Sequence, residues 1–473
     1  MPPHMSYPGC REQRKQVLGL CNLVSKSDED WREAAKKDKF ADFVIITTTD
    51  QQHKDPVVAF ARKGYDILLE KPMAVTPEDC KEIVDVCKAS NVTMAVCHVL
   101  RYTPWVTMIK DVIDSGRIGD VVNIRLTEPV GFWHFAHSFV RGNWCKEGKS
   151  TFALMSKSCH DVDLIAYWMN PRKCVSVSSF GKLSHFTKSN KPAQASSRCL
   201  DCPVEQECPY SARKIYIDAY KSGNTGWPVK VITDIVDLEN ITKALRTGPY
   251  GKCVYDMDND VVSHQVVNFQ FDDGATANFS MVAFTKNICA REVKVYGTKG
   301  EITYEGGWDR MHICDFRTGN TEYWPIENKY PTEMAGHGGA DFQLMKTFIE
   351  ALKNGTAQLA TNPEATLRSH LLVFAAEKAR LENKVVTINA DGDFVVQQDE
   401  ATAHTSRATQ QFLIDQGVDF VAKDGWPPQS PDSNPMDYAM WDSLAESEKV
   451  YMGQLIPFIE NKRNKAKDIL KTG

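Results

Sequence analysis

The sequence predicts an α/β fold whose first part contains parallel strands, and residues 42–72 carry this prediction. Phe43–Thr47 is apolar and rich in β-branched residues, as expected of a strand buried on both faces. Ile67–Leu69 is a second short apolar run. Between them, Pro56–Arg62 has the pattern of a short helix, and Gly64 is suited to end it. Strand, helix and strand in this order predict a parallel pair, with a ligand site beyond the carboxyl ends of both strands.

Polar residues follow both predicted strands. Thr48, Asp50 and His53 come after the first strand, and Glu70 and Lys71 come after the second. These five residues are therefore the first candidates for a binding site. The alternative is that Glu70 and Lys71 form an ordinary solvated charge pair, because charged side chains are mostly exposed.

Composition limits the class of protein. A length of 473 residues predicts two to four domains, and 42% hydrophobic residues with ten Trp support a packed core. The net charge of −5 gives no electrostatic footprint for nucleic acid. No apolar run reaches the roughly 18 residues needed to cross a bilayer. The fourteen Cys are scattered, which suits a reducing cytosol and predicts a cytoplasmic protein.

The next elements alternate between helix and strand. Thr76 is a suitable N-cap, Pro77 suits the first helical position, and the predicted helix runs to about Ser90. Further predicted elements are the strand Thr93–Val99, the helix Pro104–Ser115 and the strand Val121–Leu126. Arg101 follows the first of these strands, so it either approaches a ligand or forms a surface pair with Tyr102.

The rest of the chain up to residue 388 also shows regular patterns. Leu154–Trp168 reads as an amphipathic helix, on which His160 and Asp163 share a face because they are three residues apart. Predicted later elements are the strands Val261–Phe271, Thr276–Ala283, Glu292–Gly297 and Ile302–Tyr304, the helices Phe342–Leu352 and Pro363–Glu382, and the short strand Lys384–Ile388.

Residues 128–144 are dense in aromatic, His and Arg side chains. Aromatic faces and fixed polar groups are common in pockets that hold small polar molecules. His134, His137, Arg141 and Trp144 are therefore candidates for substrate contacts. The alternative is a packed aromatic loop whose histidines have structural partners.

Several motifs together resemble one enzyme family. They are D-x-V-I-I-x-T-x-D-x-x-H at 42–53, G-x-x-x-L-L-E-K-P-M-A at 64–74, R-Y-T-P, E-P-V-G-F-W-H, A-H-S-F-V-R-G-N-W and K-S-C-H-D-V-D-L-I. From about Trp31 to about Ile388 the chain resembles the glucose–fructose oxidoreductase / inositol 2-dehydrogenase (Gfo/Idh/MocA) family. The resemblance implies NAD or NADP and hydride transfer at a hydroxyl carbon of a sugar, polyol or related compound.

The resemblance also implies a domain organisation. Residues 1–119 would be a partial dinucleotide-binding (Rossmann) domain, an incomplete doubly wound sheet. Residues 120–389 would be an α+β domain with a large, mostly antiparallel sheet that binds substrate and forms a homo-oligomer. Residues 390–473 would be a separate α/β fragment.

The same resemblance assigns roles to individual residues. Hydride transfer from a carbinol needs a base and stabilisation of the alkoxide, which implies His160 and Lys71 as catalytic residues. The residues implied to contact substrate are Arg101, His137, Arg141, Trp144, Lys157 and Asp163. Many relatives carry Asp four residues before this histidine, where the chain has Ser156, so a Lys157–His160 pair is expected to replace it. The alternative is that His160 is structural.

The start of the chain departs from the family. Residues 1–41 lack the strand, G-x-G-x-x-G and helix that normally bind the pyrophosphate. Either the true start has been lost or the cofactor pocket is incomplete, and weakened cofactor binding is expected. Gly336–Gly339 is expected to be a loop before the helix Asp341–Asn354, because no strand precedes it.

Three cysteines raise the question of a metal site. Cys199 and Cys202 have C-x-x-C spacing, and Cys208 lies nearby. Together with Cys174, His185 or Cys253 they could bind a structural zinc ion tetrahedrally. The alternative is that they are three reduced thiols in a loop.

After Asn389 the character of the sequence changes. The stretches D-F-V-V-Q-Q-D-E-A-T-A-H-T-S-R-A-T-Q-Q-F-L at 393–413 and A-K-D-G-W-P-P-Q-S-P-D-S-N-P-M-D-Y-A-M-W-D-S-L at 422–444 resemble the catalytic core of mariner-type transposases, in which carboxylates bind metal ions. Matching positions are Asp399, after the predicted strand Phe394–Gln397, and Asp432. We interpret both as relics, because about 80 residues of half a core bury too little surface to be stable alone.

Two other functions compete with the oxidoreductase. One is a catalytically dead remnant that binds small ligands or self-associates through its sheet. The other is a DNA-transacting protein derived from the transposase-like tail, against which the lack of a basic face argues.

Overall fold

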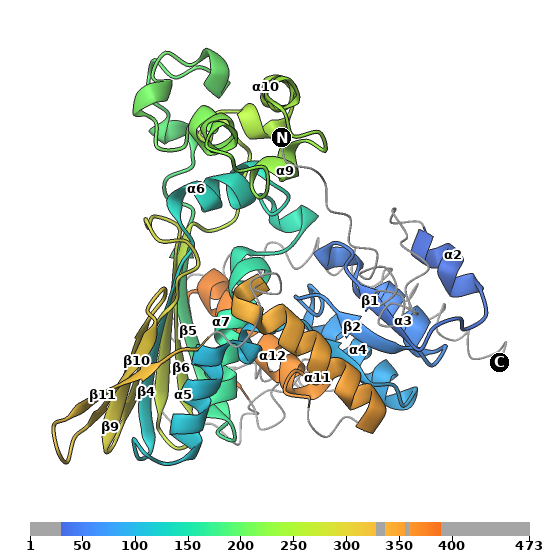
Figure 1. Cartoon of the computed structure of the whole chain (residues 1–473), viewed down its shortest axis with the longest axis vertical. Helices are drawn as coiled ribbons and strands as arrows, with labels where there is room; N and C mark the ends of the chain where they lie inside the picture. The colour runs from blue at the N-terminus through green and yellow to red at the C-terminus, as the bar shows by residue number, and fades with distance from the viewer. Residues whose placement is uncertain (1–29, 328–335, 355–358, 389–473) are drawn as a thin grey trace, which may run out of the picture. The chain divides into compact units, whose positions relative to one another are not determined.

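The structure is a computed structural model that describes residues 30–327, 336–354 and 359–388 (Figure 1). The transposase-like tail with Asp399 and Asp432 lies outside the described residues. Within them, the chain forms a three-stranded parallel sheet followed by a nine-stranded mixed sheet flanked by helices. The predicted fold class is therefore confirmed. No helix in the described ranges is long and apolar enough to cross a membrane.

The parallel sheet has the strand order β1-β2-β3. The elements of this part are α2 (Asp30–Lys36), β1 (Phe43–Ile46), η1 (Asp50–Gln52), α3 (Lys54–Ala61), β2 (Asp66–Leu69), α4 (Pro77–Ala89), β3 (Met94–Val96), η2 (Val99–Tyr102) and α5 (Pro104–Asp114). Thr76 Oγ1 accepts a hydrogen bond from Asp79 N at 3.1 Å, so the predicted N-cap is confirmed. The expectation that the first strand is buried on both faces is wrong, because Ile45 is 46% exposed and β1 lies at the edge of the sheet that the described strands form.

Strand β3 is shorter than predicted. It ends at Val96, and the chain turns at His98, whose backbone N–H donates to Val96 O at 2.7 Å. The following turn of 3₁₀-helix, η2, buries Arg101 instead of leaving it on the surface. The end of the predicted strand and the turn after it therefore place two polar side chains, His98 and Arg101, in the interior.

The large sheet has the strand order β11-β10-β9-β8-β4-β7-β6-β5-β12. Its strands are β4 (Val121–Pro129), β5 (Cys174–Lys182), β6 (His264–Phe271), β7 (Thr276–Val282), β8 (Glu292–Gly297), β9 (Gly300–Glu305), β10 (Arg310–Asp315), β11 (Thr321–Pro325) and β12 (Val386–Thr387). Only β4 and β7 pair in parallel, so the sheet is mostly antiparallel, as expected. Strands β5, β10 and β11 were not predicted.

Three helices of the second part pack against elements of both parts of the chain. Helix α7 (Ala153–Met169) packs on β4 and β7, and α12 (Pro363–Glu382) packs on α7, β5, α4 and β3 (Figure 1). Helix α11 (Ala340–Asn354) contacts η2. Thirteen of the seventeen residues of α7 are buried, so it is a central helix and not the amphipathic helix predicted.

An insertion between β5 and β6 has its own small core. It contains the short helices α8 (Ala219–Lys221), α9 (Val229–Ile232) and α10 (Leu238–Thr247). The core includes Ile215, Tyr216, Val229, Ile241 and Leu245. The aromatic segment 128–144 is not a loop. It forms α6 (Phe132–Phe135) and the π-helix η3 (Ala136–Arg141), and Trp133 packs against the core of the insertion.

Candidate active site

Lys71 reaches from the first sheet to a helix of the second part. It lies two residues beyond the end of β2, and its Nζ donates a hydrogen bond of 2.8 Å to Ser156 O in α7. His160 is in the same helix, one turn later, so Ser156 and His160 share a helix face. The structure therefore brings the two predicted catalytic residues, Lys71 and His160, to the same place.

The surroundings of His160 disfavour its protonated form. Burial lowers its pKa well below the usual value, and the positive charge of Lys71 lowers the pKa further. A neutral imidazole has one ring nitrogen with a free lone pair, which is the form that can accept a proton. The surroundings of His160 thus favour a base.

His98 was not predicted as a site residue, although it contacts His160 directly. The Nδ1 atoms of the two rings are 3.4 Å apart, and His98 is fully buried. Burial lowers the pKa of His98 to about 4. The signal in the sequence was its place just beyond strand β3, matching that of Lys71 beyond β2.

Arg101 and Asp163 form a buried bidentate ion pair. Arg101 Nε and Nη2 each donate to Asp163 at 2.6 Å, and Arg101 Nη1 donates to Ala360 O. Burial alone would raise the pKa of Asp163, but the Arg101 guanidinium lowers it overall. Because the guanidinium and the carboxylate already pair with each other, the structure does not support the predicted contacts of Arg101 and Asp163 with substrate. Asp163 Oδ2 lies 3.8 Å from His98 Nδ1, so the pair borders the histidine contact.

His53 ties together the segments that follow β1 and β2. It is 1% exposed, and its ring nitrogens lie 2.6 Å from Pro72 O and 2.9 Å from Thr48 O. Each nitrogen thus lies within hydrogen-bond distance of a backbone carbonyl, and the one that carries hydrogen donates to its carbonyl. His53 holds the Thr48 segment against the Lys71 segment instead of offering a free group to a ligand.

Asp50 connects the end of β1 to the second part of the chain. Asp50 Oδ2 accepts hydrogen bonds from Trp144 Nε1 at 3.1 Å and from Ser150 Oγ at 2.7 Å. Glu70 Oε2 accepts from the backbone N–H of Lys71 at 3.2 Å. The predicted cofactor residues Thr48, Asp50 and Glu70 therefore lie at the carboxyl ends of β1 and β2.

Lys157 belongs to a buried charge cluster beside the candidate site. Lys157 Nζ lies 3.2 Å from Glu128 Oε1 and 2.9 Å from Cys289 Sγ. Arg291 Nε lies 2.8 Å from Glu128 Oε2 and 2.9 Å from Asp161 Oδ1. Burial alone would lower the pKa of Lys157, but Glu128 raises it overall. The ion pair and the hydrogen bond of Lys157 are with this cluster and not with His160. Sequence reasoning singled out none of the other four members of the cluster.

His137 and Arg141 contact the insertion. His137 Nδ1 lies 2.8 Å from Tyr216 Oη. Arg141 is 2% exposed and donates to Lys252 O and Tyr210 O, each at 2.9 Å. Their recorded hydrogen-bond partners therefore lie in the insertion and not at Lys71 and His160.

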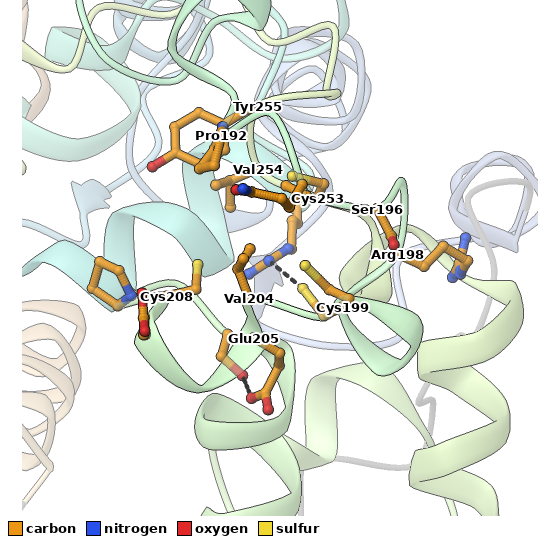
Figure 2. Close-up of a pocket in the computed structure, with 17 residues that line it drawn as sticks. Pro192, Ser196, Arg198, Cys199, Val204, Glu205, Cys208, Cys253, Val254 and Tyr255 are labelled. Atoms are coloured by element: carbon orange, nitrogen blue, oxygen red, sulfur yellow. Dashed lines mark hydrogen bonds between the residues drawn. The ribbon is translucent and has the colours of Figure 1, made fainter.

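The cysteines predicted as metal ligands line a separate cavity of about 260 Å³ (Figure 2). Cys199, Cys202, Cys208 and Cys253 all line it and are all reduced, and Arg141 Nη2 donates to Cys199 Sγ at 3.3 Å. Among the residues that the structure describes, no three His, Cys, Asp or Glu side chains are placed to hold a metal ion. The predicted zinc site at Cys199, Cys202 and Cys208 is therefore not supported.

Comparison with known proteins matches two family profiles. Residues 12–98 match the profile described as "oxidoreductase family, NAD-binding Rossmann fold". Residues 110–388 match its companion, described as "oxidoreductase family, C-terminal alpha/beta domain". The two matches cover well over half of the chain. The first begins ahead of Trp31, inside the stretch in which no dinucleotide-binding motif was found.

Individual proteins are similar over different shares of the chain. YteT of Bacillus subtilis (strain 168), described as an oxidoreductase, is 25% identical over 353 residues, which cover 70% of this chain and 77% of YteT. Inositol 2-dehydrogenase of Salmonella typhimurium is 27% identical over 170 residues, so the match spans 33% of this chain and just under half, 47%, of that enzyme. Levoglucosan dehydrogenase superposes with a TM-score of 0.56 at 17% identity, covering 81% of this chain and 88% of that one. The last likeness concerns the fold alone.

Proposed function

The chain belongs to the Gfo/Idh/MocA family of oxidoreductases, and from this premise we propose that it is an NAD(P)-dependent enzyme that oxidises or reduces a hydroxyl carbon of a sugar, polyol or related compound. The observation that carries the proposal is the hydrogen bond from Lys71 Nζ to Ser156 O, one helical turn from His160. In this proposal residues 1–119 hold the cofactor and residues 120–389 hold the substrate.

The polar groups at the carboxyl ends of β1 and β2, which are mainly hydrogen-bond acceptors, fit the nicotinamide riboside half of the cofactor. The carboxylates of Asp50 and Glu70 accept hydrogen bonds from hydroxyl groups, which the ribose offers, and the Thr48 hydroxyl both donates and accepts. When bound, the nicotinamide supplies or accepts the hydride. His53 keeps the two segments together, as its two carbonyl contacts indicate.

His160 and Lys71 divide the proton chemistry. During oxidation, His160 Nε2 takes the hydroxyl proton, and the Lys71 ammonium stabilises the negative charge that develops on the substrate oxygen. During reduction the same groups act in reverse, so that His160 returns a proton to the oxygen. The lowered pKa of His160 keeps it neutral, and thus able to act as a base, at neutral pH.

The proposal is tested with purified full-length chain. NADH and NADPH are titrated by fluorescence, and a panel of polyols, aldoses and anhydrosugars is then screened with NAD⁺ and NADP⁺ for absorbance at 340 nm. We expect saturable binding and oxidation of at least one compound, and loss of turnover in Lys71→Met. The matched control is Lys243→Met, at an exposed lysine of α10. A cooperatively folded protein that binds neither cofactor at millimolar concentration would overturn the proposal in favour of a non-catalytic remnant.

A further inference from the structure

We propose that His98 is a positioning residue for the base His160 and receives the Nδ1 proton of His160 when the substrate is oxidised. This inference rests on the proposed function. It gives a role to a buried histidine that sequence reasoning did not single out. The juxtaposition behind it is the contact of the two Nδ1 atoms at 3.4 Å.

Sheet topology places His98 beside Lys71. Strands β2 and β3 are parallel neighbours, and Leu69 pairs with Val96. Lys71 and His98 are each two residues beyond this pair, so they emerge from the same end of the sheet. One strand end therefore supplies the cation, and its neighbour supplies a partner for the base.

Helix α7 itself supplies no side chain that takes the place of His98 beside His160. The residue one helical turn before His160 is Ser156, which has no carboxylate to offer the imidazole. Ser156 Oγ donates to Phe152 O at 3.3 Å, within its own helix, and Ser156 O accepts from Lys71 Nζ. His98 is the polar side chain whose contact with the His160 ring the structure records.

The contact restricts which nitrogen of His160 carries the proton. A hydrogen bond between two Nδ1 atoms needs a hydrogen on one of them only. If His160 Nδ1 donates, His160 Nε2 keeps its lone pair and can accept the hydroxyl proton. If His98 Nδ1 donates, the neutral His160 carries hydrogen on Nε2 and can give it to a carbonyl oxygen. The two arrangements correspond to the two directions of the reaction.

The proposed step conserves protons and charge. The C–H bond of the carbinol breaks with its electron pair leaving as hydride to the oxidised nicotinamide, and the hydroxyl proton goes to His160 Nε2. The Nδ1 proton of His160 passes to His98 Nδ1. The positive charge lost by the nicotinamide then resides on His98, 3.8 Å from Asp163 Oδ2.

The charged and titratable neighbours of His98 come from four elements. They are Lys71 beyond β2, Arg101 in η2, His160 and Asp163 in α7, and His370 in α12. His370 Nε2 accepts from Met73 N at 2.9 Å, so a neutral His370 carries its proton on Nδ1, which faces Thr366 O at 3.1 Å. His370 is thus fully engaged, and the proton path ends at His98.

The test compares His98→Leu and His98→Gln with wild type. Nitrogen-15 NMR of histidine-labelled full-length protein reports the tautomer of His160, with His160→Gln to assign the signal. We expect one defined tautomer in wild type, a mixture in His98→Leu, and partial restoration in His98→Gln, whose amide can hydrogen-bond His160. The matched control is His312→Leu on β10, with no expected effect.

Kinetics give the second readout. We expect kcat to fall on the order of 10- to 100-fold in His98→Leu, with KM nearly unchanged and the acid limb of the pH profile displaced. An unchanged His160 tautomer, or an unchanged kcat and pH profile in a folded His98→Leu variant, would overturn the inference. A tautomer change in a protein without any turnover would uphold the positioning of His160 and count against the proposed function alone.

Discussion

Lys71 Nζ and Ser156 O are joined by a hydrogen bond of 2.8 Å that links the end of β2 to helix α7. Because His160 follows one turn later in α7, this bond fixes an ammonium group near an imidazole from another part of the chain. Neither sheet could form such a site alone. The chemistry proposed for the chain therefore depends on how α7 packs against the parallel sheet.

The first prediction concerns the charge of Lys71. Replacing Lys71 by Met removes the ammonium that stabilises the developing alkoxide, so kcat should fall on the order of 10²–10³-fold. Lys71→Arg keeps a positive charge but changes the shape of the charged group, so its kcat should lie between those of wild type and Lys71→Met. Steady-state kinetics with cofactor binding as a separate measurement checks this. A Lys71→Met enzyme with nearly normal kcat would contradict the role of Lys71.

The second prediction concerns the ion pair of Arg101 and Asp163. Asp163→Asn leaves the Arg101 guanidinium buried without its counter-charge, which should cost about 3–5 kcal/mol of unfolding free energy. The double variant Arg101→Met/Asp163→Leu removes both charges and should be less destabilised than Asp163→Asn. Urea denaturation compares the two. If the single variant is as stable as wild type, the pair does not have the structural role assigned to it.

Local patterns in the sequence predicted much of the fold. The Thr76 cap and the helix Pro363–Glu382 could be predicted from nearby residues alone, and the structure confirms both. Strands β5, β10 and β11 were missed because their polar residues weaken the alternating pattern. Helix α7 appeared amphipathic because its polar residues, such as Asp163, are buried by partners from distant segments that a local pattern does not contain.

The candidate site was predictable only in part, for the same reason. Lys71 and His160 stand in motifs that can be found along the chain. His98 depends on the register between two strands and on a turn that shortens β3. Arg141 looked like a substrate residue because it stands in an aromatic, His-rich segment, but its partners come from residues more than 50 positions later. Such contacts follow from tertiary structure.

The third prediction concerns stability at acidic pH. Burial lowers the pKa of His98 to about 4 and that of His370 to about 3, below the usual value of about 6.5. Between the folded and the unfolded pKa of each histidine, the unfolded chain binds more protons than the folded one. The free energy of unfolding is therefore highest above about pH 6.5 and falls as the pH decreases. Each histidine should contribute up to about 1.4 kcal/mol per pH unit. Urea midpoints from pH 7 to pH 4.5 should show this loss, with a smaller slope in His98→Leu. A midpoint independent of pH would contradict it.

The fourth prediction concerns the link between Asp50 and Trp144. Asp50→Ala and Trp144→Phe each remove the hydrogen bond of 3.1 Å between the η1 segment and the second part of the chain. A double-mutant cycle should give a coupling energy of about 1.5–3 kcal/mol, as expected for a bond to a charged acceptor. Ser150→Ala, which leaves the Trp144 bond in place, is the matched control. Strictly additive effects of the two substitutions would show that the bond does not contribute.

The fifth prediction separates a structural from a substrate-binding Arg141. Its guanidinium donates to two backbone carbonyls and to Cys199 Sγ, and no side-chain carboxylate pairs with it among the described residues. Arg141→Lys keeps the charge but, with a single nitrogen, loses one or two of the three contacts, so the insertion should lose about 1–2 kcal/mol of stability, roughly 1 kcal/mol per lost bond. KM for the substrate should stay within about threefold of wild type, because the recorded partners of Arg141 lie in the insertion. Limited proteolysis of residues 183–262 and steady-state kinetics measure the two effects. A stable Arg141→Lys variant whose KM rises strongly would contradict this and support a contact between Arg141 and substrate.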